Sequence, residues 1–195
     1  MADAYVLFDR ITHQLLDWEE EGGPGAPDSI RWESVGIEDT LEERLPEFEG
    51  LSSTDATSQN EWMLMDLHEI ANHPHRSCIS CHAVPDVIGP MRSELMILTG
   101  MMIIRMRRKE EPFLDDDTFP ILMLSIIGRE TRLIQAHIVP EEQRVKVSYS
   151  QLFDFDHCPQ QETLDLIWKW LLSEPVSNEV VFIRRGRRFS SVSKP

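Results

Sequence analysis

The residues best suited to chemistry lie close together in the run HPHRSCISCH, from His73 to His82. This run holds two of the three cysteines and three of the seven histidines of the chain. A Cys-x-x-Cys spacing in a tight turn directs two sulfur atoms at one metal ion, and zinc takes four nitrogen or sulfur ligands in a tetrahedron. The spacing therefore makes Cys78 and Cys81 candidate zinc ligands, on a loop bounded by prolines.

The remaining zinc ligands have two sources in the sequence. His73, His75 and His82 lie in the same run, whereas His157 and Cys158 lie before a later helix and would tie that helix to the loop. The alternative is an exposed loop with free thiols and incidental histidines. The same residues also have the haem-attachment spacing Cys-x-x-Cys-His, but that motif belongs to exported proteins and we expect no export signal. Zinc is therefore the one cofactor that the sequence suggests.

Complete catalytic motifs are missing from the sequence. It contains no Gly-x-Ser-x-Gly elbow, no Walker loop and no Gly-x-Gly-x-x-Gly run. The acidic run from Asp115 to Asp117 is typical of a solvated loop, and a lone histidine such as His137 within an apolar strand is more often packed than catalytic. The sequence therefore leans toward a protein that is not an enzyme, without deciding the question.

Negative charge is concentrated in the first third of the chain. Residues 1–70 hold 18 acidic and 3 basic residues, whereas residues 71–195 hold 16 of each. An acidic surface repels phosphate backbones, so we expect no nucleic-acid partner. The acidic segment either keeps the chain solvated or docks on a protein partner of basic character.

No segment of the sequence has the pattern of an export signal or a membrane span. The most apolar window, Leu95–Ile104, is about half of the roughly 20 residues that cross a bilayer. We therefore expect a cytoplasmic or nuclear location and no membrane partner. The basic run from Arg184 to Arg188 resembles a nuclear-import sequence.

The chain divides into an acidic arm, a folded body and a basic tail. Apolar residues at three- and four-residue spacing predict an amphipathic helix over 4–20. The segment 21–60 is rich in turn-forming, small and acidic residues, which predicts a mostly flexible chain. We place the arm at 1–60, a folded α+β domain at 61–184 and the tail at 185–195.

Within the body, apolar spacing predicts a helix over 61–71, and a loop is expected over 73–82. A second helix is predicted after Pro90 as far as residue 98. The continuation to residue 108 is open between helix and strand. Three strands joined by short turns predict an antiparallel meander. The expected order is helix, three strands, helix, strand (αβββαβ), with strands over 119–128, 131–139 and 144–150, a helix after Pro159, and a last strand over 179–184.

Two resemblances accompany these patterns. The αβββαβ order resembles the core of restriction-endonuclease-like folds, but none of the four lysines is preceded by the Asp/Glu-x of that family's metal site. The runs PILMLSIIGRETRLIQAHI, RVKVSYSQLFDF and TLDLIWKWLLSEPV, within 119–176, resemble small uncharacterised proteins of filamentous fungi. That resemblance implies a fungal source, and some such proteins resemble members of secondary-metabolite gene clusters.

These observations support one leading function and two alternatives. The leading hypothesis is a non-catalytic accessory or regulatory factor that acts by protein–protein interaction, with the acidic arm as a docking segment. The first alternative is a small accessory enzyme or pathway protein of secondary metabolism, with its pocket in the apolar meander. The second alternative is an inactive restriction-endonuclease-like domain.

Overall fold

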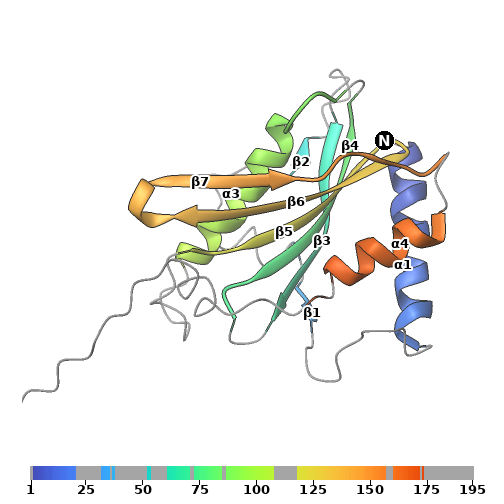
Figure 1. The fold of residues 1–195 in the computed structure, drawn as a ribbon, viewed down its shortest axis with the longest axis horizontal. Helices are drawn as coiled ribbons and strands as arrows, with labels where there is room; N and C mark the ends of the chain where they lie inside the picture. The colour runs from blue at the N-terminus through green and yellow to red at the C-terminus, as the bar shows by residue number, and fades with distance from the viewer. Residues whose placement is uncertain are drawn as a thin grey trace, which may run out of the picture.

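A computed structural model describes residues 2–20, 32–35, 37, 52–53, 61–70, 73–84, 87–107, 118–156, 160–171 and 173. The fold is α+β, as the sequence predicts, with a mixed sheet between helices (Figure 1). The helices are α1 (Ala2–Glu20), α3 (Arg92–Arg107) and α4 (Gln160–Leu171). The strands are β1 (Trp32–Ser34), β2 (Ser52–Ser53), β3 (Glu61–Ile70), β4 (Arg76–Ala83), β5 (Ile121–Ile127), β6 (Glu130–Val139), β7 (Arg144–Tyr149) and β8 (Phe153–Asp154), with a short 3-10 helix at Pro140–Glu142.

The strands form a sheet in the order β1-β3-β4-β5-β6-β7, with β2 also beside β3 and β8 also beside β6. The central pair, β4 and β5, is parallel, and the other pairs are antiparallel. A parallel pair needs a long crossover, which α3 supplies. The predicted meander β5-β6-β7 is confirmed, and its first turn contains Gly128 at a positive φ of 61° that glycine adopts without strain.

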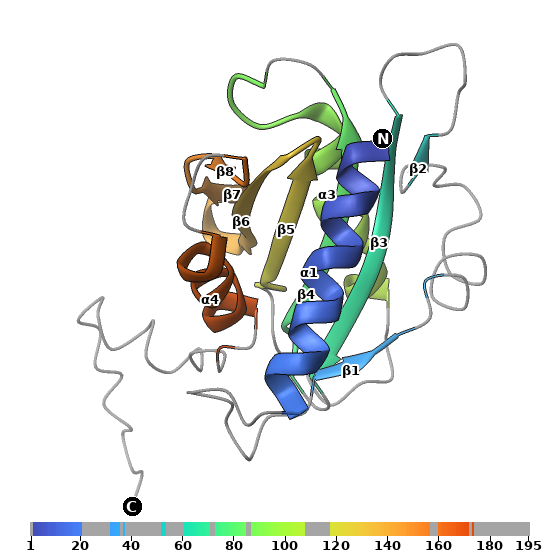
Figure 2. The same ribbon diagram turned by 90° about the vertical axis from the view of Figure 1, so that its right-hand side faces the viewer.

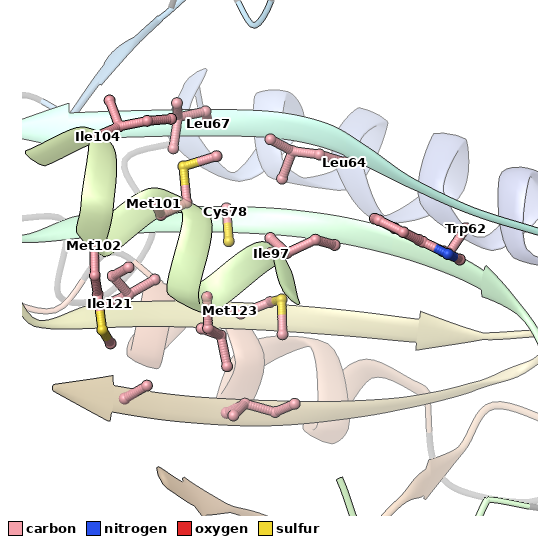
Figure 3. Packing of buried hydrophobic residues seen from close by; sticks show 13 residues of the cluster. Trp62, Leu64, Leu67, Cys78, Ile97, Met101, Met102, Ile104, Ile121 and Met123 are labelled. Atoms are coloured by element: carbon pink, nitrogen blue, oxygen red, sulfur yellow. The ribbon is translucent and has the colours of Figure 1, made fainter. Parts of the chain in front are cut away.

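Helices cover both faces of the sheet. Figure 2 shows α1 and α4 on the near face and α3 behind it. Side chains alternate along each strand, so the two faces carry separate apolar clusters. The α3-face cluster contains Trp62, Leu64, Leu67, Cys78, Ile97, Leu98, Met101, Met102, Ile104, Ile121, Met123, Ile134 and Ala136 (Figure 3). The α1/α4-face cluster contains Ala4, Leu7, Ile11, Ile79, Cys81, Leu124, Ile126, Leu133, Phe155, Leu164, Ile167, Trp168 and Leu171.

The helix predicted over 61–71 is wrong, because this segment is strand β3. The pairing of β3 with β4 shifts register between Leu64 and Asp66, so Met65 forms a bulge. A bulge adds one residue to a strand and changes which residues share a face. Leu64 and Leu67 therefore both enter the α3-face cluster at a spacing of three, which imitates the period of a helix.

The loop predicted over 73–82 is also wrong from residue 76 onward, because that part is the central strand β4. Every residue from Arg76 to His82 is buried, since helices cover the strand on both sides. Such a strand shows no alternation between polar and apolar residues. The helix after Pro90 is confirmed and continues to Arg107, and the predicted strand over 179–184 lies outside the described residues.

The predicted N-terminal helix is confirmed as α1, and it packs on the body of the protein. Ala4, Leu7 and Ile11, at helical spacing, are buried against the sheet. Two pieces of the segment 21–60 are described as strands, β1 and β2, and both pair with β3. None of the described helices is long and apolar enough to cross a membrane.

Candidate binding site

The structure separates the two cysteines that the sequence analysis places at one metal ion. Cys78 and Cys81 are three positions apart on β4, so their side chains point to opposite faces of the sheet. Cys78 lies in the α3-face cluster beside Met101, and Cys81 lies in the α1/α4-face cluster, where its sulfur is 3.7 Å from the carbonyl oxygen of Ala4. Burial raises the pKa of each thiol to about 12, so both are protonated.

The other candidate zinc ligands do not complete a site around either sulfur. His82 shares the α3 face with Cys78 and bonds to serines, whereas His73 lies before β4, with its ring 6.3 Å from that of His75. His157 and Cys158 lie outside the described residues. Within the described ranges, no three His, Cys, Asp or Glu side chains come together in a group able to hold a metal ion. The geometry therefore gives no support to zinc at this cysteine pair.

A buried ion pair lies where α3 begins. Arg132 of β6 donates from two nitrogens to the two carboxylate oxygens of Glu94, and the backbone N–H of Met91 donates to the same carboxylate at 2.7 Å. Glu94 is the third residue of α3, so it also caps the helix and lies at the positive end of its dipole. The guanidinium of Arg132 lies 5.5 Å from the ring centre of Tyr149.

His82 lies beside this ion pair, between two hydroxyl groups. Its Nε2 is 2.9 Å from the hydroxyl of Ser80, and its Nδ1 is 3.0 Å from the hydroxyl of Ser93. Burial, and then the charge of Arg132, lower the pKa of His82 to about 3, so the ring is neutral. The side chains of this group are at most 7% exposed, which leaves a substrate no route to the histidine. The group is suited to stabilising the fold rather than to catalysis.

A second charged group lies at the other end of α3. Glu69 of β3 forms ion pairs with Arg76 of β4 and with Arg105 of α3, and Arg105 also donates to the carbonyl oxygen of His73 at 2.7 Å. Arg105 is only 4% exposed, although it lies at the start of the basic run RMRRK. Unlike the first group, this one adjoins a hollow at the surface, because Arg76 also lines it.

This hollow, here called the tryptophan depression, is the best candidate for a binding site. It has a volume of about 270 Å³ and lies where β1, the starts of β4 and β5, the end of β6 and the end of α4 meet. Protein sites for small ligands are commonly about 300–1,000 Å³, so this one suits a small ligand or a single side chain. Its lining residues are Trp32, His75, Arg76, Pro120, Ile121, Leu122, Gln135, Ala136, His137, Trp170 and Ser173.

The lining of the tryptophan depression is basic and aromatic. Among the residues that the structure describes, it includes two indole rings, two imidazoles and Arg76, and it includes no carboxylate. His137 pairs across the sheet with Lys146, and burial together with the charge of Lys146 lowers the pKa of this histidine. These groups can donate hydrogen bonds to an anion, while the indoles and neighbouring apolar side chains can hold a flat apolar body.

The tryptophan depression is not predicted from the sequence, although some of its residues differ from the pattern around them. His137 and Gln135 are polar positions in an apolar strand, where they mark the face that carries the depression. Trp32 lies in the segment predicted to be flexible, and Trp170 lies opposite the buried face of α4. Only the fold brings these distant residues together.

Comparisons with models of known protein families, with curated proteins and with solved structures found no match to this chain.

Proposed function

We propose that this protein is a non-catalytic factor that binds another protein, and that an extended segment of the partner pairs with the free edge of β7. The observation that carries this proposal is the position of β7 at the end of the sheet. Of the strands that the structure describes, only β6 pairs with it. An open strand edge presents unpaired backbone groups, which is the basis of recognition by strand addition.

The register identifies the backbone groups that face outward. The N–H of Ser150 donates to the carbonyl oxygen of Leu133 at 2.9 Å, so the groups of this residue point toward β6. Backbone groups alternate in direction along an antiparallel strand. The backbone N–H and C=O groups therefore also point toward β6 at Ser148, Lys146 and Arg144. The N–H and C=O groups of the intervening residues, Val145, Val147 and Tyr149, point to the open edge.

The side chains of β7 favour an acidic or neutral partner. Val145 and Tyr149 are 41% and 50% exposed on the face that α3 covers elsewhere, and they offer apolar contact. Lys146 lies on the opposite face. A lysine on an edge strand opposes self-pairing, because a second copy would bring like charges together. A different protein with an acidic side chain at this position would be attracted instead.

A proline substitution tests the backbone contact directly. Val147→Pro removes an outward N–H and leaves the β6–β7 bonds in place, so folding should continue while strand addition fails. Val147→Thr is the matched control, because it keeps the N–H and a similar shape. Affinity purification of tagged full-length protein should give one set of partners for wild type and V147T, and V147P should lose them.

Lys146→Pro provides the opposite control, because it removes an N–H that points toward β6 and should lower the melting temperature. If V147P captures the same partners as wild type, binding at this edge is contradicted. The acidic arm stays a separate prediction, since most of 1–60 lies outside the described residues. The buried apolar side chains of α1, namely Ala4, Leu7 and Ile11, already contact the sheet. A cytoplasmic or nuclear setting belongs to the same proposal.

A second candidate function is a pathway protein that binds a small metabolite. The observation that favours it is the tryptophan depression, which lies beside the predicted meander and combines aromatic with hydrogen-bonding side chains. A thermal-shift screen would test this function, because a ligand that binds only the native state raises the melting temperature.

A further inference from the structure

The chemistry of the tryptophan depression narrows the ligand it would take. The whole chain carries a net charge of −15, yet none of the side chains known to line the depression, all of them within the described ranges, is acidic. Its titratable lining residues are His75, Arg76 and His137, and Lys146 lies directly across the strands from His137. This local excess of basic groups in an acidic protein favours an anion.

Trp32 adds an independent observation. Its indole Nε1 is buried and has no hydrogen-bond partner among the residues that the structure describes. Buried donors are nearly always paired in folded proteins, so an unpaired one calls for an acceptor. Trp32 lines the depression, so a ligand bound there would lie beside this indole.

The rest of the lining defines the body of the ligand. Trp170, which is 43% exposed, lies at the rim, and Pro120, Ile121 and Leu122 supply apolar surface. Aromatic side chains and flat apolar groups pack well by stacking. The volume of about 270 Å³ limits this body to one or two rings.

We propose that the tryptophan depression binds a small aromatic carboxylate, with the carboxylate held by Trp32, His75 and His137 and the ring system packed against Trp170. This inference deepens the second proposed function and rests on it. It does not depend on the β7 edge, because binding of a small molecule is measured without any protein partner.

Two probes, naphthalene-2-carboxylate and naphthalene-2-carboxamide, share a ring system and differ in charge. Comparing them separates the contribution of the charge to binding from that of the ring. We expect full-length protein at pH 7 to bind the carboxylate, by calorimetry, with a Kd between about 10 µM and 1 mM, as befits a ligand of this size. The amide should bind at least about tenfold more weakly, because it carries no charge for the basic lining to attract.

Two variants test the assigned residues. Trp32→Phe keeps an aromatic ring and removes the N–H, and His137→Gln removes the imidazole. Each should weaken carboxylate binding about three- to tenfold, the effect of one lost hydrogen bond, and should change amide binding less. His68→Gln is the matched control, because His68 lies on β3 beside Asp66 and does not line the depression, so its Kd should equal that of wild type.

Three results would overturn the inference. They differ in whether the proposed small-ligand function survives. Equal binding of carboxylate and amide would end the assignment of an anion and leave the small-ligand function intact. If W32F and H137Q bind the carboxylate as tightly as wild type does, Trp32 and His137 do not hold the carboxylate. Binding of neither probe, together with no stabilised ligand in the thermal-shift screen, would remove the small-ligand function as well.

Discussion

The two ends of α3 carry similar charged groups in different surroundings. At the start of the helix, Glu94 and Arg132 form an ion pair among side chains that solvent does not reach. At its end, Glu69 pairs with Arg76 and Arg105, and Glu69 is 14% exposed beside the tryptophan depression. Paired buried charge is therefore not by itself a sign of a functional site. Access to a hollow is what distinguishes the second group.

The largest expected effect comes from breaking the sealed ion pair. Arg132→Met leaves the carboxylate of Glu94 buried with no cation, which typically costs about 3–5 kcal/mol of stability. We expect urea unfolding to show a loss of this size. Replacing both partners, with Arg132→Met and Glu94→Leu, should recover part of the loss, because no uncompensated charge remains. A loss below about 1 kcal/mol in the single variant would show that solvent reaches this end of the helix.

A smaller effect is expected from pH at the same end. The folded-state pKa of His82 is about 3, well below the ordinary value of 6.5, so the unfolded chain binds a proton that the native protein excludes. Stability from this residue is present above pH 6.5 and is lost as the pH falls toward 3. Linkage then gives a loss of about 2 kcal/mol between pH 7 and pH 5. The lowered pKa of His137 acts in the same direction.

His82→Gln provides the control for this pH dependence, since glutamine keeps hydrogen-bonding groups and does not titrate. The variant should show a flatter dependence of unfolding free energy on pH between 7 and 5. An unchanged slope would assign the pH dependence to other residues.

The open end of α3 should respond differently to loss of its acid. Glu69→Gln leaves Arg76 and Arg105 without a full counter-charge, at a cost of about 1–2 kcal/mol because this region is partly solvated. It should also tighten naphthalene-2-carboxylate binding by about two- to threefold, since the depression gains positive potential. Glu94→Gln should lower stability without changing the Kd. Equal effects of the two variants on ligand binding would erase the distinction between the two ends.

The smallest effect is expected from Trp32→Phe on stability. The indole N–H has no described partner to lose, so unfolding free energy should change by less than about 0.5 kcal/mol. This near-neutral result, measured by urea unfolding, would sharpen the contrast with Arg132→Met. A loss above about 1 kcal/mol would mean that the N–H serves the fold.

The sequence predicts the meander β5-β6-β7 and helix α4, and it does not predict strands β3 and β4. The β6–β7 hairpin and α4 each show one polar and one apolar side, which gives a clear period. Strand β3 is missed because its bulge at Met65 produces a helical spacing. Strand β4 is missed because burial on both faces removes alternation and its small cysteines and serines resemble a loop.

The binding site is harder to predict than the fold for a different physical reason. The zinc hypothesis depends on residues close in sequence, and the strand sends neighbouring thiols to opposite faces. The tryptophan depression is lined by Trp32, His75, His137 and Trp170, which come from four separate parts of the chain. No local pattern relates such residues, and only the pairing of β1 with β3 and the packing of α4 bring them together.

The parallel pairing of β4 with β5 has a consequence for the order of folding. The meander β5-β6-β7 uses contacts between neighbouring segments, which form quickly because little chain entropy is lost. The central pair joins Arg76 to Ile121, so the chain between them must close into a loop before the bonds form. We therefore expect the meander to assemble early and the joining of the two halves of the sheet, with α3 packed across them, to limit the folding rate.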